Sequence, residues 1–511
     1  MKSIICAFLL APFLTGQSFQ QRVQAIMSRP AYRHSRFGME FYSLDSGQAL
    51  YKLNADQLFV PGSTTKLVTI GTALGVLGPD YRFHTRIYRG GPLRANGTLK
   101  GDLILVAGGD PNLSARVGAD GTLAFENVDH SYAPTPGAKA VPGNPLGVIE
   151  ELAKQVAAKG VKKIEGVVRV DVTLFPEGEK ELGTGVVISP IVVNDNIVDV
   201  LVAPGAKEGD AATVTLSPET AYVQIVNRAT TGAPRTPATV HLSSEQKHSV
   251  VLEGSIPLGG PVALRPYKVP EPSAYAATVL KEALQRLGIR VEGKTEPGEP
   301  YSADTLLADH VSAPLIEEAR VTLKVSQNLH ASMTAPYLIG TYGADPKGEG
   351  KADPVTAGFA AERALLKDAG LDVGSAVQSD GAGAAAFFTP DFMVRYLTFL
   401  SQQSFATQFR AALPVMGKDG TLAAIQKDSP AAGHVFAKTG TYGTADLLNH
   451  ELFITGKGLA GYIVTAKGQT LAFAAYLNLV PAPGNSADAL TRAGNALGEI
   501  AGAVYEYADA K

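Results

Sequence analysis

Apolar residues recur at three- and four-residue spacing in several stretches of the chain, which is the pattern of helices with one buried face. The clearest such helix begins near Ser63 and carries apolar residues at Leu67, Ile70, Leu74 and Leu77. Gly78 followed by Pro79 is a typical stop signal, so this helix is expected to end there. The last helix predicted, over 487–507, shows the same spacing, and further helices are predicted over 20–27, 145–159, 273–287, 315–324, 329–339, 357–369 and 390–400.

β-rich runs bounded by turn residues lie on both sides of a long, differently composed middle section. A hairpin is predicted at 37–44 and 48–53, a further strand at 82–89, and C-terminal strands at 435–438, 451–455, 462–465 and 470–477. Between residues 86 and 304, Gly and Pro are frequent and short β-rich runs dominate, at 101–106, 167–172, 188–203, 212–216, 221–226 and 249–252. We therefore expect a mostly-β region there, in one or two lobes.

Length, charge and the N-terminus narrow the class of protein. A chain of 511 residues should hold more than one domain or a large insertion, and its net charge of −3 gives no reason to expect a nucleic-acid partner. Residues 1–18 have the form of a secretory signal, because Lys2 precedes a short apolar run. Cys6, the only cysteine, lies within it, so the mature chain would have no disulfide. We expect an exported, periplasmic protein with no stable membrane span.

A serine and a lysine three positions apart stand at the start of the clearest helix. Ser63 and Lys66 would share a helical face, so that the hydroxyl could act as nucleophile and the amine as its base. The alternative is that Ser63 caps the helix and Lys66 is solvated. The same spacing recurs at 244–247 in a polar stretch, where we predict a turn.

Two further motifs decide between these interpretations. Ser326-Gln327-Asn328 stands at a predicted break between two helices, and Lys438-Thr439-Gly440-Thr441 stands at the end of a predicted strand. Alone, the first would be a helix cap and the second a turn with a solvated lysine. In this order, however, Ser-x-x-Lys, Ser-x-Asn and Lys-Thr-Gly are the signatures of penicillin-recognising serine enzymes.

With these motifs the sequence resembles the D-alanyl-D-alanine carboxypeptidase/endopeptidase family, the type-4, class C low-molecular-mass penicillin-binding proteins. The large insertion between the first two motifs is typical of that group, as are the segments at 101–103, 108–111, 193–196, 379–381 and 417–422. The chain departs from the usual pattern at four positions: Ala382 and Ala385 replace serines, Gln327 replaces Asp or Asn, and Ser332 stands where an acid is common.

The resemblance implies an α+β fold, with an antiparallel five-stranded sheet flanked by helices. The catalytic domain would be discontinuous, comprising residues 19–85 and 305–511, with 86–304 inserted as one or two subdomains. Because the motifs lie on both sides of the insertion, we expect the inserted region to carry none of the primary chemistry. Joining residue 85 to 305 through a short linker is then expected to preserve acylation.

The chemistry of these residue types suggests a role for each. Ser63 would attack the carbonyl between two D-alanines and pass its proton to Lys66, whose pKa is lowered by burial beside a second cation, Lys438. Ser326 would relay the proton to the leaving amine, and Asn328 would hold Lys66 and the substrate amide.

The third motif would bind the substrate. Lys438 and Thr439 would take its terminal carboxylate, with Gly440 between them and Thr441. Backbone N–H groups of Ser63 and Thr441 would hold the oxyanion. Water would then release the acyl-enzyme, without a metal or an organic cofactor.

Substrates and partners follow from the same resemblance: peptidoglycan stem peptides as substrates, β-lactams as inhibitors, and no nucleic acid. The balance between carboxypeptidase and endopeptidase activity, and whether the chain forms a homodimer, stay open. A β-lactamase or esterase on the same scaffold is one alternative, and a non-catalytic cell-wall binding protein is another. The Asp/Asn cluster at 194–199 lacks a complete calcium loop and is expected to cap strands.

Overall fold

A computed structural model describes residues 18–114, 116–118, 120–293, 301–343, 353–484 and 486–507. The predicted signal segment, with Cys6, lies outside the described residues except for Ser18, which caps the first helix. Among the described residues, no helix combines the length and the apolar character needed to cross a bilayer.

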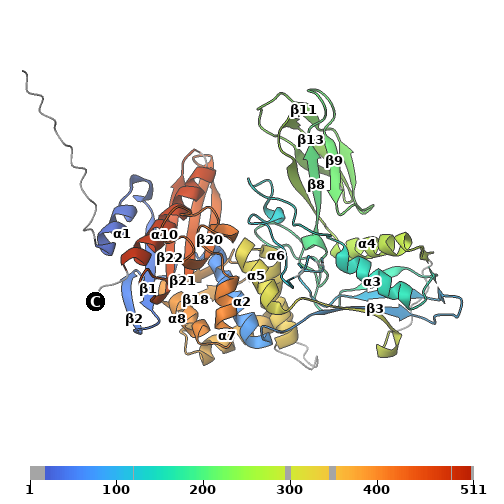
Figure 1. Ribbon diagram of the computed structural model, residues 1–511, viewed down its shortest axis with the longest axis horizontal. Helices are drawn as coiled ribbons and strands as arrows, with labels where there is room; N and C mark the ends of the chain where they lie inside the picture. Colours follow the sequence, from blue (N-terminus) through green and yellow to red (C-terminus); the bar gives the residue numbers. More distant parts are fainter. Residues whose placement is uncertain are drawn as a thin grey trace, which may run out of the picture.

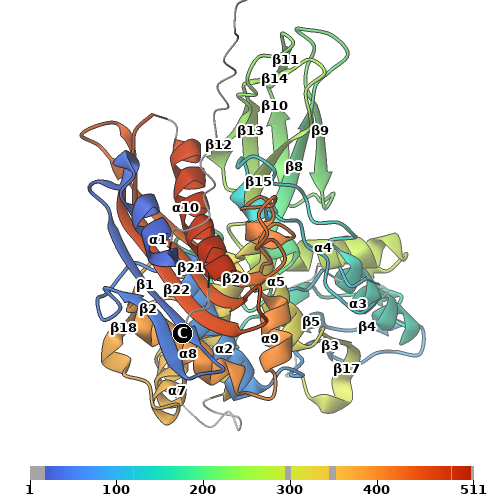
Figure 2. The ribbon, with the colours of Figure 1, turned by 60° about the vertical axis from the view of Figure 1, so that its left-hand side comes forward.

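A five-stranded antiparallel sheet organises the catalytic domain, in the order β2-β1-β22-β21-β20 (Figure 1). Its strands are β1 (Arg36–Ser43), β2 (Gln48–Leu53), β20 (Val435–Asp446), β21 (Glu451–Val464) and β22 (Thr470–Ala482). Alternate residues of β21 enter different cores: Leu459 packs with α1 (Phe19–Met27) and α10 (Ser486–Tyr507), and Ala460 with α2 (Thr65–Leu77) and α8 (Pro390–Ser401). Helices therefore cover both faces of the sheet, as predicted (Figure 2).

The prediction of two strands at 451–455 and 462–465 was wrong, because β21 is one continuous strand. Two glycines of β21 that lie between the predicted strands make close backbone contacts. A Cβ on Gly456 would lie 2.5 Å from the Val60 carbonyl oxygen, and one on Gly458 would lie 2.9 Å from that of Pro61. The sheet needs glycine there because the turn that carries Ser63 packs directly against it.

The remaining helices of this domain are α5 (Leu315–Val325), α6 (Asn328–Ser332), α7 (Pro354–Asp368) and α9 (Ala406–Ala412), with a small hairpin of β18 (Ala376–Gln378) and β19 (Ala386–Phe388). The helix predicted over 329–339 is interrupted. After α6 the chain widens into a π-type segment, Met333–Gly343, in which Ala335 is extended. Pro336 explains this, since proline lacks an N–H and disfavours the helical conformation of the preceding residue.

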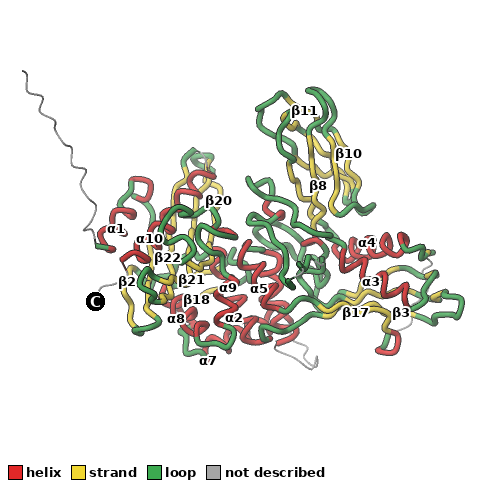
Figure 3. The backbone as a smooth tube through the Cα atoms, in the orientation of Figure 1, coloured by secondary structure: helices red, strands yellow, loops and turns green. Residues whose placement is uncertain are grey.

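The inserted region forms two lobes, which Figures 1 and 3 show to the right of the sheet. The helical lobe contains α3 (Gly147–Ala158), α4 (Pro272–Arg286), β3 (His84–Gly90), β4 (Thr98–Leu99), β5 (Asp102–Val106), β6 (Lys163–Ile164), β7 (Val168–Asp171), β16 (Arg290–Val291) and β17 (Leu306–Val311). The β lobe contains β8 (Ile197–Ala203), β9 (Thr213–Ser217), β10 (Gln224–Asn227), β11 (Thr230–Gly232), β12 (His241–Gln246), β13 (Ser249–Glu253), β14 (Ser255–Pro257) and β15 (Ala263–Lys268).

Two predictions within the inserted region were wrong. The strand predicted at 188–203 begins only at Ile197, after a turn in which Asp195 has φ +55°. The second Ser-x-x-Lys stretch was predicted as a turn, but its first three residues belong to β12, which pairs with the apolar strand β13.

The two ends of the inserted region run side by side. β3 and β17 pair antiparallel in one sheet with β5 and β7. The boundary predicted at 86 falls inside β3, and that at 304 falls just before β17. Phe175, Val186 and Ile188 of the inserted region belong to the same buried cluster as Leu67 of α2. The inserted region and the catalytic domain therefore share a core.

Candidate active site

Ser63 and Lys66 face each other at the start of α2, as their spacing predicted. Ser63 lies in a short 3₁₀ turn, Gly62–Thr64, and Lys66 lies in the first turn of the helix. Lys66 Nζ is 2.8 Å from Ser63 Oγ, 2.6 Å from Asn328 Oδ1 and 3.2 Å from the Ala382 carbonyl oxygen. Both of the latter atoms can only accept, so a neutral amine could donate to them and direct its lone pair at the serine hydroxyl.

The electrostatic setting of Lys66 favours that neutral form. The side chain has no exposed surface. Burial lowers the pKa of Lys66 to about 7, and the carboxylates of Glu181 and Asp380 limit the decrease. An amine that titrates near neutrality can act as a general base under ordinary conditions.

A loop at 380–385 fixes the carbonyl that Lys66 contacts. Asp380 accepts backbone hydrogen bonds from Ala382, Gly383, Ala384 and Ala385. These bonds hold the loop through its backbone, so neither alanine at 382 nor alanine at 385 removes a support that the loop needs.

The second motif lies at the break between α5 and α6, as predicted. Ser326 ends α5 in the left-handed region, at φ +67°, and the Gln327 side chain caps α6 by accepting from the Leu329 N–H at 2.8 Å. Lys438 Nζ lies 2.9 Å from Ser326 Oγ. Burial, reinforced by the charges of Lys66 and Lys457, holds the pKa of Lys438 well below its usual value.

The third motif lies on β20, the edge strand of the sheet beside the Ser63 turn. A Cβ on Gly440 would lie 2.0 Å from the Pro61 carbonyl oxygen, and one on Gly62, at φ +53°, 2.6 Å from the Thr441 nitrogen. Two glycines thus allow the strand and the turn to touch. Thr439 Oγ1 lies 2.8 Å from Thr421 Oγ1, which joins the predicted segment 417–422 to the site.

All three motifs line one cleft of about 720 Å³, and so does the inserted region. Ser63, Ser326 and Thr439 come from the catalytic domain, whereas Tyr132 and Gly183 come from the insertion. The space around the motif residues is therefore partly bounded by inserted backbone and side chains.

Inserted residues also hold the second motif in place. The Tyr132 hydroxyl donates to the Ser326 carbonyl oxygen at 2.5 Å, and Gln327 Nε2 donates to Asp129 Oδ1 at 3.2 Å. Sequence reasoning missed these contacts. The expectation that the inserted region carries none of the primary chemistry stays a prediction: the predicted motif residues lie outside it, and its own residues contact the second motif.

A buried ion-pair network ties the two domains together beside this motif. Asp195 Oδ2 lies 2.7 Å from His130 Nε2, and Asp195 Oδ1 lies 2.7 Å from Nε2 of His330, which belongs to α6. The other nitrogens of these rings face Asp199 at 2.8 Å and Glu318 at 2.5 Å. Within the cluster at 194–199, Asp195 and Asp199 form these ion pairs, whereas Asn194 and Asn196 bond to the backbone around the start of β8, as a strand cap would.

The charges of the network follow from its geometry. Burial lowers the pKa of both histidines, but the adjacent carboxylates outweigh it: the pKa of His130 is raised well above its usual value, and that of His330 to about 10. The two imidazolium rings hold the pKa of Asp195 well below its usual value, despite burial. Each ring is therefore a cation between two carboxylates.

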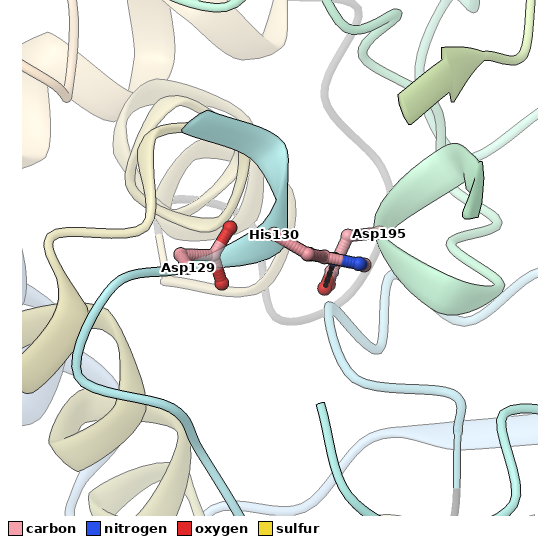
Figure 4. A group of neighbouring side chains, drawn as sticks. All are labelled: Asp129, His130 and Asp195. Carbon is pink, nitrogen blue, oxygen red and sulfur yellow. Dashed lines mark hydrogen bonds and ion pairs between the residues drawn. The ribbon is translucent and has the colours of Figure 1, made fainter. Parts of the chain in front are cut away.

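Asp129, His130 and Asp195 also offer three ligand atoms within 4.8 Å of one another (Figure 4). These groups fit an ion-pair network better than a metal site. Both nitrogens of His130 are engaged by carboxylates, and Asp129 accepts from the Ser131 N–H and from Gln327. Absence of a metal at this position stays a prediction.

Comparison with known proteins agrees with the motifs. The model of the D-Ala-D-Ala carboxypeptidase 3 (S13) family matches residues 19–497. The chain is 29% identical over 448 residues to a D-alanyl-D-alanine carboxypeptidase of Actinomadura sp. (strain R39), covering 83% of this chain and 76% of that protein. It is 22% identical over 491 residues to the D-alanyl-D-alanine carboxypeptidase DacB of Haemophilus influenzae, covering 92% and 91%.

The fold agrees as well. The crystal structure of penicillin binding protein 4 (dacB) from Haemophilus influenzae matches with a TM-score of 0.69 at 20% identity, covering 95% of this chain and 99% of that one. The family model spans nearly all of the described chain, including the inserted region and all three motifs. This chain therefore belongs to the D-Ala-D-Ala carboxypeptidase 3 (S13) family of peptidases.

Proposed function

We propose that the protein is exported and hydrolyses the D-Ala-D-Ala bond of peptidoglycan stem peptides through an acyl-enzyme on Ser63. The observation that carries this proposal is the position of Lys66 Nζ. It lies 2.8 Å from Ser63 Oγ in a fully buried setting that lowers the lysine pKa to about 7. A solvated lysine beside a capping serine would have neither property.

In the acylation step, Ser63 Oγ bonds to the carbonyl carbon of the penultimate D-Ala while Lys66 takes the hydroxyl proton. The bond from that carbon to the leaving nitrogen then breaks, and the nitrogen receives, through the Ser326 hydroxyl, the proton that Lys66 took from Ser63. The bond between Lys438 Nζ and Ser326 Oγ, 2.9 Å long, supports this relay. Water attacks the ester in the second step and regenerates Ser63.

Backbone groups at the contact between the turn and β20 would stabilise the oxyanion. The close approach of Gly62 to the Thr441 nitrogen brings the backbone of Thr441 next to the nucleophile. One oxyanion-hole donor is typically worth about 3 kcal/mol. Lys438, Thr439 and Thr441 would bind the terminal carboxylate, with Gly440 permitting the approach of strand and turn.

The comparisons suggest further activities. A second structure of the Haemophilus influenzae protein is a complex with a β-lactam. We infer that β-lactams bind this chain and acylate Ser63. Endopeptidase cleavage of cross-linked peptides is proposed alongside carboxypeptidase activity, since both reactions pass through the same acyl-enzyme chemistry at Ser63.

Mass spectrometry after incubation with penicillin tests the proposal. We expect one adduct per chain, on the peptide that contains Ser63, and none in Ser63→Ala. Ser244→Ala, in the other Ser-x-x-Lys stretch, is the matched control and should retain the adduct. A wild-type protein that neither carries an adduct nor turns over penicillin, or a label on the Ser244 peptide, would show that Ser63 is not the nucleophile. Rapid turnover of penicillin without release of D-Ala from a pentapeptide would favour a β-lactamase.

A further inference from the structure

A second pocket, of about 280 Å³, adjoins the catalytic cleft. Thr421, Thr439 and Thr441 line both spaces, so the pocket continues the cleft at the end where the third motif lies. Lys457 of β21 and Gly494 of α10 contribute to its other walls. Because Thr439 and Thr441 are proposed to face the leaving group, the pocket lies on the leaving-group side of the scissile bond.

Lys457 brings a cation to this boundary. It pairs with Thr441 in the register of β20 and β21, and its Nζ donates to Thr441 Oγ1 at 2.6 Å. The side chain runs along α10, where a Cβ on Gly494 would lie 3.5 Å from Lys457 Cε. In the part of the chain that the structure describes, no carboxylate lies within ion-pair distance of Lys457. This half-buried ammonium has a hydroxyl partner but no counter-charge.

The other lysine of this region is engaged elsewhere. Lys438 Nζ donates to Ser326 Oγ and to the Thr439 carbonyl oxygen, both at 2.9 Å, and is fully buried. Burial and the neighbouring lysines favour its neutral form, whereas burial lowers the pKa of Lys457 only to about 8, so that Lys457 remains mostly protonated at neutral pH. The positive charge available to an anion at this end of the cleft therefore belongs mainly to Lys457.

We propose that Lys457 is a specificity-determining residue that binds, together with Thr441, the α-carboxylate of the amino acid released from the substrate. Its ligand class is a D-amino acid with a free carboxylate on the C-terminal side of the scissile bond. Lys457 Nζ holds Thr441 Oγ1 as an acceptor, which leaves the threonine proton free to point at the carboxylate, while the ammonium supplies the charge. The proposal rests on the proposed function, because it assigns the leaving group to this side of Ser63.

Paired substrates test the role of the charge. One is an acyl-D-Ala-D-Ala peptide with a free carboxylate, and the other is the same peptide with a C-terminal carboxamide. Lys457→Gln keeps a donor for Thr441 but removes the charge. In Lys457→Gln, we expect kcat/KM for the carboxylate substrate to fall about tenfold or more, which is the typical effect of losing a charged hydrogen bond. The kcat/KM value for the carboxamide substrate should change little. Lys457→Arg should keep the preference for the carboxylate.

Lys139 offers a matched control, because it lines the catalytic cleft from the inserted region and, among the described residues, forms no hydrogen bond to the third motif. Lys139→Gln should leave the ratio of the two kcat/KM values unchanged. Equal loss on both substrates in Lys457→Gln would show that Lys457 only supports the structure of Thr441, and an unchanged ratio would show that its charge is not used. Either result overturns the proposal while the proposed function stands. A wild-type protein that neither releases D-Ala nor forms a penicillin adduct on Ser63 would overturn both.

Discussion

Substituting Asp195 by asparagine removes one negative charge from the buried network while preserving the shape of the side chain. In the wild type, the Asp195 carboxylate accepts from two histidine rings, one in the inserted region and one in α6. An asparagine can accept at only one atom and carries no charge. Two buried imidazolium rings then each lose a carboxylate partner, and we expect Asp195→Asn to be strongly destabilising.

The pKa of His330 indicates how large the loss of stability in Asp195→Asn should be. It is raised from 6.5 to about 10, which at 1.36 kcal/mol per pH unit corresponds to about 5 kcal/mol of preference for the charged ring. Glu318 and Asp195 share this effect, and the loss at His130 adds to it. Removing one partner of a buried ion pair typically costs about 3–5 kcal/mol. We expect the free energy of unfolding to fall by about that amount.

The pH dependence has a definite sign. A histidine whose folded pKa lies above its unfolded value stabilises the fold fully below pH 6.5, and this stabilisation is lost as the pH rises toward 10. The difference in stability between wild type and Asp195→Asn should therefore be large at pH 6 and shrink by pH 10. Urea denaturation at both pH values measures it.

Asp391 provides a surface control. It also contacts two cations, Lys52 and Arg395, but is partly exposed. Exposed ion pairs usually contribute less than about 1 kcal/mol, so Asp391→Asn should be nearly neutral. If Asp195→Asn unfolds within about 1 kcal/mol of the wild type at pH 6, the histidines are not charged and the reasoning about this network is wrong.

Three further outcomes are expected. The rate of penicillin acylation should rise with pH and reach half its maximum near pH 7, because only neutral Lys66 can accept the proton of Ser63. A rate that does not change between pH 6 and pH 8 would contradict a base with a pKa of about 7. Tyr132→Phe removes the hydroxyl that bonds to the Ser326 carbonyl. It should lower the free energy of unfolding by about 1 kcal/mol, measured by urea denaturation, and should slow acylation. An unchanged acylation rate would mean that this hydrogen bond does not position Ser326. Gly494→Ala, inside α10, should stabilise the protein by about 0.5–1 kcal/mol in thermal unfolding, because the new Cβ meets no described atom outside its own helix backbone closer than 3.5 Å. The matched substitution Gly498→Ala would place a Cβ 2.7 Å from a side chain and should not stabilise the protein.

Much of the site could be predicted from the sequence because its motifs are local. The three-residue spacing of Ser63 and Lys66 on a helix, and the break at Ser326, are properties of short segments. The comparisons confirm the family and enzyme class that the motifs indicated, and the α+β fold with its antiparallel sheet. The roles of the individual residues remain predictions.

What sequence reasoning missed depends on contacts between distant segments. Tyr132 and Ser326 are 194 positions apart, and Asp195 and His330 are 135 apart. No periodicity connects such pairs, and a buried histidine between carboxylates has no local signature. Gln327 was noted as an unusual residue in the second motif. Its side chain both caps α6 and bonds to Asp129, but the sequence alone does not show that Asp129 lies beside it.

The same contacts change how the inserted region should be understood. It was expected to carry none of the primary chemistry, and that expectation stays a prediction. Its side chains nevertheless pack against α2, bond to the carbonyl of Ser326 and place the Asp195 carboxylate beside the charged ring of His330. A fragment that joins residue 85 to 305 would expose that core and leave His330 without Asp195. Loss of acylation in such a fragment would therefore not locate any catalytic group in the insertion, because the second motif would lose its support at the same time. Single substitutions at Tyr132 and Asp195 distinguish structural support from a part in the reaction. Each one removes a contact to the second motif or to α6 and leaves the residues of the proposed mechanism unchanged: Ser63, Lys66, Ser326 and Asn328.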